Sequence, residues 1–397
     1  MKIGIVSPYF YPWYGGITEH VYYQYEELRR RGHEVKVISP FDGGGKIDAE
    51  DVIKLGYPVP LIVNGSVVKV PLVFRRKSKV DRIIEAGEFD IIHMHQPLFC
   101  VLGLSFLGCV RARRMKGQSV PMMVGTFHAC GGGTERFLIK RCGFFFRRFS
   151  REFSALIAVS FASRDFVHPV LPGLYDIIPN GIDVARFSSS KGKIEKFDDG
   201  VVNILFVGRL EPRKGLTSLL RSLPLISSYT QSEFRLIVVG NGVLTRYYKN
   251  KVPASVQDRV HFVGGVSFDD LPRYYKTADI FCSPATYGES FGIVLVEAMA
   301  SGVSVVAGNN EGYRKVIRDD VNGVLVDPEN IESLARSLAS LVDSEEMRKR
   351  LSRQGAKDCV QYSWSAIVDR IEKVYWGCEK STRRVYAAQK GDYSYLA

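Results

Sequence analysis

The stretch VNILFVGRLEPRKGL, residues 202–216, carries the pattern that decides the fold. Five of its first six residues are apolar, as in a strand that is buried on both faces of a parallel sheet. A glycine and a charged loop follow directly, and a helix-like segment comes next. A buried strand, a polar loop and a helix in this order form one unit of an alternating α/β fold.

The same alternation runs along most of the chain and restarts near residue 201. In the first half, short apolar runs lie at 2–7, 34–39, 90–95, 121–128, 154–160 and 175–181. In the second half they lie at 202–210, 234–240, 259–265, 279–285, 302–308 and 323–327. The sequence therefore predicts an α/β chain of two Rossmann-like, doubly wound domains that face a central cleft.

A polar boundary separates the two halves. The 397 residues are enough for two domains, and a Ser- and Lys-rich stretch at 186–201 lacks hydrophobic periodicity. We therefore expect a first domain at 1–190, a linker at 191–200 and a second domain at 201–361. A helix at about 362–380 is expected to pack back on the first domain.

The net charge of +12 is concentrated in one region. Residues 111–151 hold ten Lys and Arg against one acid, Glu135, which gives a local excess of +9. Such a patch predicts an anionic partner, either lipid headgroups or a polyanion. No RNA- or DNA-binding signature accompanies the charge, so nucleic acid is not expected.

Two basic segments are candidates for a membrane surface. The segment RFLIKRCGFFFRRFSREF, residues 136–153, interleaves cations with aromatic rings, as in a helix lying on lipid. The alternative is a core-packed helix with a solvated basic face. The segment VFRRKSKVDR, residues 73–82, is the second cluster. The cations expected at the surface are Arg75, Arg76, Lys77, Lys79, Arg147 and Arg148.

Cysteine usage and hydropathy indicate a cytoplasmic protein. The seven cysteines are scattered and form no CxxC motif, which is typical of reduced thiols. The N-terminus looks like a first strand and lacks the features of a signal peptide. The longest apolar stretch, Leu98 to Val110, is shorter than the roughly 20 residues that span a bilayer. We interpret it as a buried helix and expect membrane contact to be peripheral, at the inner face of the cell membrane.

Two strand ends carry candidate phosphate-binding loops. Gly15 and Gly16 follow the first strand, where paired glycines and a helix N-terminus admit an anion. The alternative is a tight turn. Arg209 and Lys214 follow the strand at 202–207 and suit a diphosphate, although a solvated basic turn has the same composition. The GxGxxG fingerprint is absent, which counts against a dehydrogenase.

Histidines mark two further strand ends. His93 and His95 lie on one face of a strand, but no third ligand is apparent, so structural roles are favoured over a metal site. The chain also lacks an Asp-x-Asp pair, and no metal or other cofactor is expected. His128 ends another strand and precedes a glycine-rich loop that could seat a phosphate or be mobile.

Two glutamates stand eight positions apart in GESFGIVLVEAMASG, residues 288–302. The run after Ser290 predicts a helix, with Ser290 as its cap and Gly302 past its end. Glu289 then precedes the helix, where a carboxylate is favourable on electrostatic grounds alone. Glu297 lies among apolar neighbours, where a charge is costly without a partner. Two hydroxyl groups of a ribose would supply one, and a structural salt bridge is the alternative.

Together these motifs resemble the GT-B glycosyltransferases of family GT4 along essentially the whole chain. The resemblance rests on GG after the first strand, TFH, IPNGID, GRLEPRKG, the pair of glutamates and EAMASGVSVVA. Within the family, VSPYF, YPVPLIVNGSV (57–67) and GESFGIVLVEAMASG are similar to the phosphatidylinositol α-mannosyltransferases. Two stretches depart from that branch, YPWYGG and ACGGGTERF, and both belong to the acceptor side.

The resemblance implies a role for each matching residue. The first domain would bind the acceptor and the second the nucleotide-sugar donor. The catalytic set would be His128, Arg209, Lys214 and Glu289. The donor would contact Gly15, Gly16, Arg209, Lys214, Val263, Glu289, Ser290, Phe291, Gly292, Ile293 and Glu297. The acceptor headgroup would face Tyr9, Asn64, Gly65 and Ser66.

The implied reaction is a retaining, metal-independent transfer of a hexose, with mannose from GDP-mannose as the first choice. The acceptor would be a lipid-linked or polyol-phosphate alcohol such as phosphatidylinositol. The leaving diphosphate would itself take the acceptor proton, and cations would stabilise its charge. Alternatives are a GT4 enzyme with a UDP-sugar and a soluble acceptor, a nucleotide-sugar epimerase, and a non-enzymatic nucleotide-sugar-binding subunit.

Overall fold

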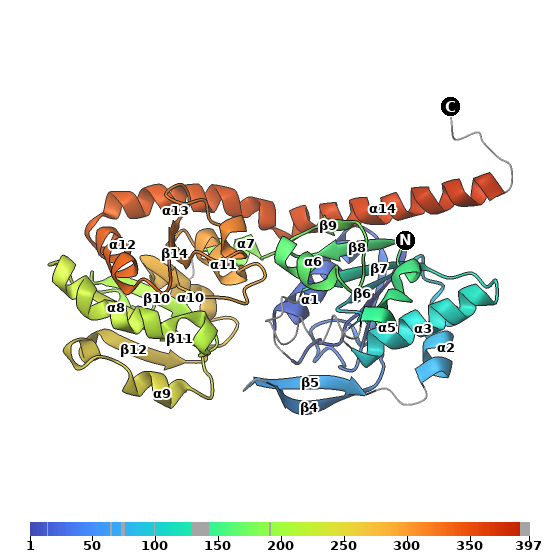
Figure 1. Cartoon of the computed structure of the whole chain (residues 1–397), viewed down its shortest axis with the longest axis horizontal. Coiled ribbons are helices and arrows are strands. Elements are labelled where there is room, and N and C mark those ends of the chain that lie inside the picture. The colour runs from blue at the N-terminus through green and yellow to red at the C-terminus, as the bar shows by residue number, and fades with distance from the viewer. Residues whose placement is uncertain are drawn as a thin grey trace. The chain divides into compact units, whose positions relative to one another are not determined.

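The computed structural model divides the chain into two compact units (Figure 1). The first unit comprises Met1–Asn180 and the C-terminal segment from Trp364, and the second comprises Gly181–Ser363. The structure describes residues 1–13, 15–63, 66–72, 76–98, 100–128, 143–189 and 192–389.

The first unit contains a seven-stranded parallel sheet with the order β3-β2-β1-β6-β7-β8-β9. Its strands are β1 (Lys2–Val6), β2 (Glu34–Ser39), β3 (Val52–Lys54), β6 (Ile91–His95), β7 (Met122–Phe127), β8 (Ala155–Ala158) and β9 (Tyr175–Ile177). The strand order reverses between β1 and β6. In a doubly wound sheet, ligands bind at the carboxyl ends of the strands beside such a reversal.

Helices cover both faces of this sheet. They are α1 (Gly16–Arg30), α2 (Arg76–Gly87), α3 (Val101–Met115), α5 (Gly143–Arg147), α6 (Phe161–Val167) and α14 (Trp364–Gln389). One buried cluster joins α2 and α3 to the sheet through residues such as Ile84 and Phe106. The other joins α1 and α14 to the opposite face through residues such as Val21 and Ile371. Since successive strand residues point to opposite faces, a continuous apolar strand feeds both cores.

A separate antiparallel hairpin follows β3. It consists of β4 (Tyr57–Val63) and β5 (Ser66–Leu72), paired from Tyr57–Leu72 to Val63–Ser66. Neither β3 nor this hairpin was predicted. The strand β3 has only three residues, and Pro58 and Pro60 in β4 and Pro71 in β5 argue against a ladder. A two-stranded hairpin leaves outward-facing amides unpaired, so proline is tolerated there.

The second unit repeats the architecture with six parallel strands in the order β12-β11-β10-β13-β14-β15. They are β10 (Val202–Val207), β11 (Phe234–Val239), β12 (Val260–Gly264), β13 (Ile280–Ser283), β14 (Ser304–Gly308) and β15 (Val324–Val326). Here the order reverses between β10 and β13. All twelve predicted strands are therefore present, and the prediction of two doubly wound α/β units is confirmed.

Seven helices of the described chain surround the second sheet. They are α7 (Val184–Ser188), α8 (Leu216–Tyr229), α9 (Thr245–Asn250), α10 (Leu271–Thr277), α11 (Ile293–Ala300), α12 (Ile331–Asp343) and α13 (Glu345–Cys359). The helices α8 and α12 share one core with residues such as Phe206 and Val306. On the other face, α10 and α11 pack with residues such as Phe281 and Val305.

The chain enters the second unit earlier than the linker expected at 191–200. Residues from Gly181 onward already belong to it. Ile182 forms a β-bridge with Ser363, and its side chain is buried in a core of the second unit. Phe187 and Phe197 are buried in the same core. The described residues on either side, up to 189 and from 192, therefore belong to the second unit.

The apolar stretch from Leu98 to Val110 contributes to α3, whose residues Leu102, Phe106 and Leu107 are fully buried. Among the described residues, none of the helices combines the length and apolarity that crossing a bilayer demands.

Candidate functional site

The loop after β10 carries an alternating series of charges. Arg209 Nη1 lies 2.9 Å from Glu211 Oε1, and Arg213 Nε lies 3.0 Å from Glu211 Oε2. Arg213 and Lys214 belong to a short 3₁₀ turn, Pro212–Lys214, which ends at Gly215. The loop thus presents three cations within six residues at the carboxyl end of β10.

Glu289 binds two of these cations through one oxygen. Its Oε1 lies 2.6 Å from Lys214 Nζ and 2.7 Å from Arg213 Nη1. The side chains are largely buried, with exposed fractions of 10% for Glu289, 14% for Lys214 and 22% for Arg213. Burial of this kind makes the pairing geometry decisive, because an unpaired charge there would be costly.

The loops meet because their strands are neighbours. Glu289 follows β13, which pairs with β10 next to the reversal of strand order. Thr286 donates its backbone N–H to Arg213 O at 2.9 Å. Gly215 has a φ of 75°, and a Cβ atom there would lie 1.9 Å from Pro284 O. A glycine is therefore required at the point of closest approach.

Glu297 lies in α11 and accepts a hydrogen bond from the Tyr275 hydroxyl to its Oε2 at 2.7 Å. Burial, with the Glu297 charge beside it, raises the pKa of Tyr275 well above its ordinary value. Neither partner considered from the sequence, a ribose or a salt bridge, is needed to explain this contact. The hydroxyl of Tyr275 fixes one oxygen of the carboxylate and orients the group.

The helix after Glu289 begins later than predicted. Ser290 makes no cap, because α11 starts at Ile293 and is preceded by Gly292 in a left-handed conformation, with a φ of 90°. A Cβ atom at Gly292 would lie 2.5 Å from the ring of Tyr313. Phe291 is buried, and Ser290, Ile293 and Val263 of β12 are half-buried.

In the first unit, the paired glycines lie where predicted. Gly16 is the first residue of α1, so the amides of the first turn have no acceptor within the helix. A Cβ atom on Gly15 or Gly16 would meet no atom within 4 Å. The backbone here is therefore open to an approaching group, as an anion site at a helix N-terminus requires.

His128 lies directly after β7 and is buried. Its Nε2 is 2.9 Å from His95 Nδ1, and its ring stacks on that of His95 at a centroid distance of 5.1 Å. Burial and the neighbouring His20 hold the pKa of His128 well below its usual range, against a hydrogen bond with Asn180 that raises it. At neutral pH, His128 is therefore an uncharged hydrogen-bonding group.

The predicted acceptor residues are only partly described. Tyr9 is half-buried in the loop between β1 and α1, where Ser7 Oγ donates to Tyr9 O at 2.7 Å. Burial raises the pKa of the Tyr9 hydroxyl, which stays protonated. Ser66 is the first residue of β5. Asn64 and Gly65 lie outside the described residues.

The cations predicted to face a membrane are also only partly described. Arg76 and Lys77 begin α2, Lys79 is exposed on it, and Arg75 lies outside the described residues. Arg147 and Arg148 are exposed.

The prediction of one helix over residues 136–153 is wrong for the residues that the structure describes, which begin at 143. From 143 onward, the five-residue α5 is followed by a separate 3₁₀ turn at Ser150–Glu152. Phe149 is buried and Phe146 packs on the same core, so these rings do not lie at a lipid interface. The alternative, a core-packed segment with a solvated basic face, describes them better.

Three important side chains were missed from the sequence. Arg213 directly precedes Lys214, so the basic loop itself offered a signal for it. Tyr275 and Gln24 offered none, because each lies far along the chain from the acid or histidine that it contacts.

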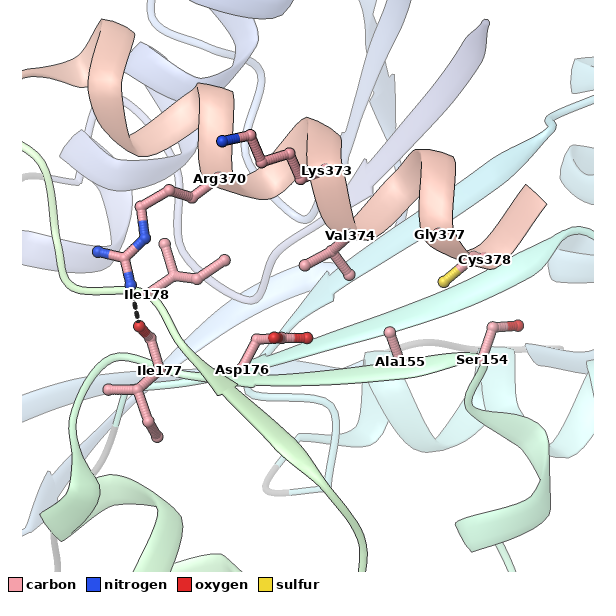
Figure 2. A pocket seen from close by; sticks show the side chains of 10 residues that line it. All are labelled: Ser154, Ala155, Asp176, Ile177, Ile178, Arg370, Lys373, Val374, Gly377 and Cys378. Carbon is pink, nitrogen blue, oxygen red and sulfur yellow. Dashed lines mark hydrogen bonds between the residues drawn. The ribbon is translucent and has the colours of Figure 1, made fainter. Parts of the chain in front are cut away.

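A cavity of about 610 Å³ lies between α14 and the edge strand β9, and it contains none of the predicted site residues (Figure 2). Arg370 reaches from α14 and donates to Ile177 O on the sheet edge. Burial raises the pKa of the Cys378 thiol to about 11, which makes it unreactive. The cavity is therefore part of the joint between α14 and the sheet.

Two doubly wound units with charged loops at the carboxyl ends of the strands are typical of two-domain glycosyltransferases, and comparison with protein-family models supports this class. The model for glycosyl transferases group 1 matches residues 189–358, and the model for glycosyltransferase family 4 matches residues 14–186. The chain belongs to glycosyltransferase family 4 and is a glycosyltransferase of the GT-B fold. A transferase is neither an epimerase nor a binding subunit, so both alternatives are set aside.

Several of the similar proteins are named as mannosyltransferases. The chain is 31% identical to the phosphatidyl-myo-inositol mannosyltransferase of Mycobacterium leprae over 98% of its own length and 100% of the relative. It is also 31% identical to the protein of the same name from Mycolicibacterium smegmatis, over 94% and 93% of the two chains. The structure of Anabaena HepE in complex with UDP superposes with a TM-score of 0.72 at 19% identity, covering 95% of this chain and 100% of that one.

Proposed function

We propose that this glycosyltransferase moves a mannosyl group from GDP-mannose to phosphatidylinositol, or to a closely related polyol-phosphate lipid, at a membrane surface. The observation that carries the proposal is the match with phosphatidyl-myo-inositol mannosyltransferases at about 30% identity over nearly the full length of both chains. The charged loops of the second unit support it, because they supply cations for a diphosphate and a carboxylate for sugar hydroxyl groups.

In the proposed donor site, Arg209 and Lys214 hold the diphosphate and the amide at Gly16 contributes a neutral donor. Guanidinium and ammonium groups stabilise the negative charge that develops on a leaving diphosphate. Glu289 binds hydroxyl groups of the transferred sugar, near the backbone of Phe291, Gly292 and Ile293. Its pairing with Lys214 at 2.6 Å supports this assignment, because the sugar and the diphosphate are neighbouring parts of one donor.

Glu297 is proposed to bind the ribose. The Tyr275 hydroxyl donates to Oε2, and a carboxylate suits a ribose because its two oxygens can accept from two hydroxyl groups. A carboxylate held in place by a buried tyrosine keeps its orientation without the help of the ligand. Val263, half-buried on β12, is the proposed neighbour of the base.

The proposed reaction retains the anomeric configuration and uses no metal. The bond between the sugar C1 and the diphosphate oxygen breaks while the acceptor oxygen bonds to the same face of C1. The acceptor proton passes to the leaving phosphate oxygen, so the products are the mannosylated lipid and GDP. His128 is proposed to lie beside the transferred sugar as a neutral group, because burial keeps its pKa low.

The test uses the full-length protein with GDP-mannose and phosphatidylcholine vesicles that contain phosphatidylinositol. We expect GDP release that depends on phosphatidylinositol, a mannosylated lipid in the mass spectrum, an α-linkage by NMR and undiminished activity in EDTA. Parallel reactions contain UDP-glucose, or free inositol as a soluble acceptor. Turnover with a UDP-sugar or a soluble acceptor, and none with GDP-mannose and the lipid, would overturn the proposal in favour of the UDP-sugar alternative.

A further inference from the structure

Four buried histidines gather in the first unit, where α1, β6 and the end of β7 meet. His20, His93, His95 and His128 are all less than one-tenth exposed. The rings of His93 and His95 stack at 4.8 Å, and His20 meets His95 and His128 edge-on at 5.1 Å and 4.9 Å. Trp364 of α14 covers His20 at 5.1 Å.

One side chain, Gln24 of α1, determines how protons are arranged in this cluster. Its Oε1 lies 3.1 Å from His95 Nε2, and its Nε2 lies 2.9 Å from both His93 Nδ1 and the Tyr375 hydroxyl. An amide oxygen accepts hydrogen bonds and cannot donate them. The proton of His95 is therefore on Nε2, directed at Gln24.

The position of that proton determines the next one. A neutral imidazole carries one proton, so His95 Nδ1 is an acceptor. His128 Nε2 lies 2.9 Å from His95 Nδ1 and must be the donor in this contact. His128 thus carries its proton on Nε2, and its Nδ1 is the basic, lone-pair-bearing nitrogen.

We propose that Gln24 and His95 are positioning residues that hold His128 in the tautomer with its proton on Nε2, so that Nδ1 is the nitrogen able to accept a hydrogen bond. The proposal rests on the proposed function in one respect, namely the place of His128 beside the transferred sugar. The tautomer itself follows from the contacts within the first unit.

The C-terminal helix takes part in setting the amide of Gln24. Tyr375 of α14 lies 2.6 Å from His93 Nδ1 and accepts from Gln24 Nε2. With Nδ1 of His93 as acceptor, its Nε2 donates to Thr126 Oγ1 at 2.6 Å. In this arrangement the Tyr375 hydroxyl accepts from the amide nitrogen and donates to His93 Nδ1, while the amide oxygen is directed toward His95.

Burial keeps the chain of contacts intact. It lowers the pKa of His20 to about 4 and that of His93 to about 3, and the pKa of His95 falls well below its usual range. Each neutral ring has one donor and one acceptor, so the direction of one hydrogen bond determines the direction of the next. A cationic ring would remove the acceptor on which the next bond depends.

The tautomers can be measured directly, without donor or acceptor. In full-length protein labelled with ¹⁵N-histidine, a long-range ¹H–¹⁵N spectrum distinguishes the protonated ring nitrogen from the bare one, and His128→Asn assigns the signals of His128. We expect a proton on His128 Nε2 in the wild type. A wild-type His128 that carries its proton on Nδ1 would overturn the proposal, because the amide of Gln24 would then point the other way.

Two variants and one matched control test the positioning roles. We expect Gln24→Leu and His95→Phe to convert His128 to a mixture of tautomers. Tyr175→Phe is the control, because it removes a half-buried hydroxyl of the same unit, which donates to Leu171 O at 2.7 Å, and leaves the contacts of Gln24, His95 and His128 in place. Should Gln24→Leu fail to fold by circular dichroism, Tyr375→Phe is the milder change and should give the same mixture in part. An unaltered His128 signal in folded Gln24→Leu or Tyr375→Phe would refute the positioning roles.

Kinetics then separate this inference from the proposed function. With GDP-mannose and phosphatidylinositol vesicles, we expect Gln24→Leu to lower kcat by about 10- to 100-fold at unchanged donor KM, the range found when the partner of a working histidine is lost at metal sites. The control Tyr175→Phe should stay within about twofold, because its hydroxyl contacts Leu171 O and none of these histidines. If the tautomer changes and kcat does not, the role of His128 in transfer fails while the tautomer assignment stands.

Discussion

Lys214 and Glu289 form an ion pair of 2.6 Å on a carboxylate oxygen that also binds Arg213. A cation proposed to bind the donor diphosphate is therefore already engaged by an anion. The diphosphate must compete with Glu289 for the ammonium group, whereas Arg213 remains on Glu289 and on Glu211. If Lys214 binds the diphosphate as proposed, it exchanges one anionic partner for another when the donor binds.

This exchange predicts opposite effects on two measurements for Glu289→Gln. Removing the competing charge should leave the affinity for GDP unchanged or raise it, by up to about tenfold for 1.4 kcal/mol. Transfer should fall, because the amide is a weaker acceptor for the sugar hydroxyl groups. Calorimetric titration with GDP and steady-state kinetics give the two values, with the exposed Glu329→Gln as control. A clear loss of GDP affinity would show that Glu289 does not compete with the diphosphate.

The two cations themselves are expected to act on the leaving group. Arg209→Ala and Lys214→Ala should each lower kcat by about 10²–10³-fold, the usual cost of removing one preorganised donor from developing charge. The exposed Arg246→Ala on α9 removes a cation of the same unit and should have little effect. Turnover within a few-fold of wild type in both loop variants would rule out the diphosphate assignment.

The contact between Tyr275 and Glu297 separates orientation from binding. Tyr275→Phe removes a buried hydrogen-bond donor and should lower the unfolding free energy of the second unit by about 1–3 kcal/mol in urea. Donor affinity should fall modestly, since the carboxylate remains. Glu297→Gln should instead weaken GDP binding by about tenfold or more, because an acceptor pair for the ribose is lost. Unchanged GDP affinity in Glu297→Gln would mean that its partner is Tyr275 and not the donor.

These contacts also show what a sequence can predict. The strands are visible because burial on both faces requires continuous apolar runs, and parallel pairing places their carboxyl ends at one edge. Arg209, Lys214 and Glu289 could be predicted as neighbours for that reason. The reversal of strand order between β10 and β13 then explains why the two loops touch.

Contacts between side chains distant in sequence could not be predicted in the same way. The sequence does not indicate that Tyr275 contacts Glu297, because a tyrosine in a short helix is usually interpreted as a core residue. The histidines at 20, 93, 95 and 128 lie on separate elements, and the register of β1, β6 and β7 brings them together. The late start of α11 depends on the Tyr313 ring against Gly292, which is also a tertiary contact.

The basic surface predicts salt-dependent binding to anionic vesicles. Arg147 and Arg148 are exposed, and each cation near an anionic surface contributes about 1 kcal/mol. Arg147→Gln with Arg148→Gln should therefore weaken sedimentation with phosphatidylinositol vesicles by about 30-fold, and added salt should weaken wild-type binding. The control is Lys249→Gln with Lys251→Gln, two exposed cations of the second unit. Binding that ignores both the double variant and the salt would exclude this surface.

The buried histidine cluster predicts that acid destabilises the first unit already above the pH range in which carboxylates ordinarily become protonated. A histidine whose pKa is lower in the folded chain than in the unfolded chain stabilises the fold above the unfolded value, near 6.5. That contribution is lost as the pH falls toward the folded value. With the pKa of His20 lowered to about 4, this one group contributes on the order of 3 kcal/mol at neutral pH.

Within the part of the chain that the structure describes, the cluster contacts neutral groups: Gln24 of α1, Thr126 of β7, Asn180, and Trp364 and Tyr375 of α14. No neighbouring carboxylate among these contacts compensates a proton. Between pH 6.5 and pH 5.5, each of the four histidines should lower the unfolding free energy of the first unit by about 1 kcal/mol, or about 4 kcal/mol together.

Tryptophan fluorescence measures this loss in the right place, because Trp13, Trp364 and Trp376 all belong to the first unit. Urea unfolding followed by this signal at pH 7.5, 6.5 and 5.5 should give an unfolding free energy that falls steeply with acid. His20→Phe keeps a ring between its neighbours and should reduce the slope by about a quarter, since one of four groups no longer titrates. A wild-type slope no steeper than that of His20→Phe would mean that folding does not lower the pKa of His20, and a wild-type free energy that does not fall between pH 6.5 and 5.5 would exclude the neutral cluster as a whole.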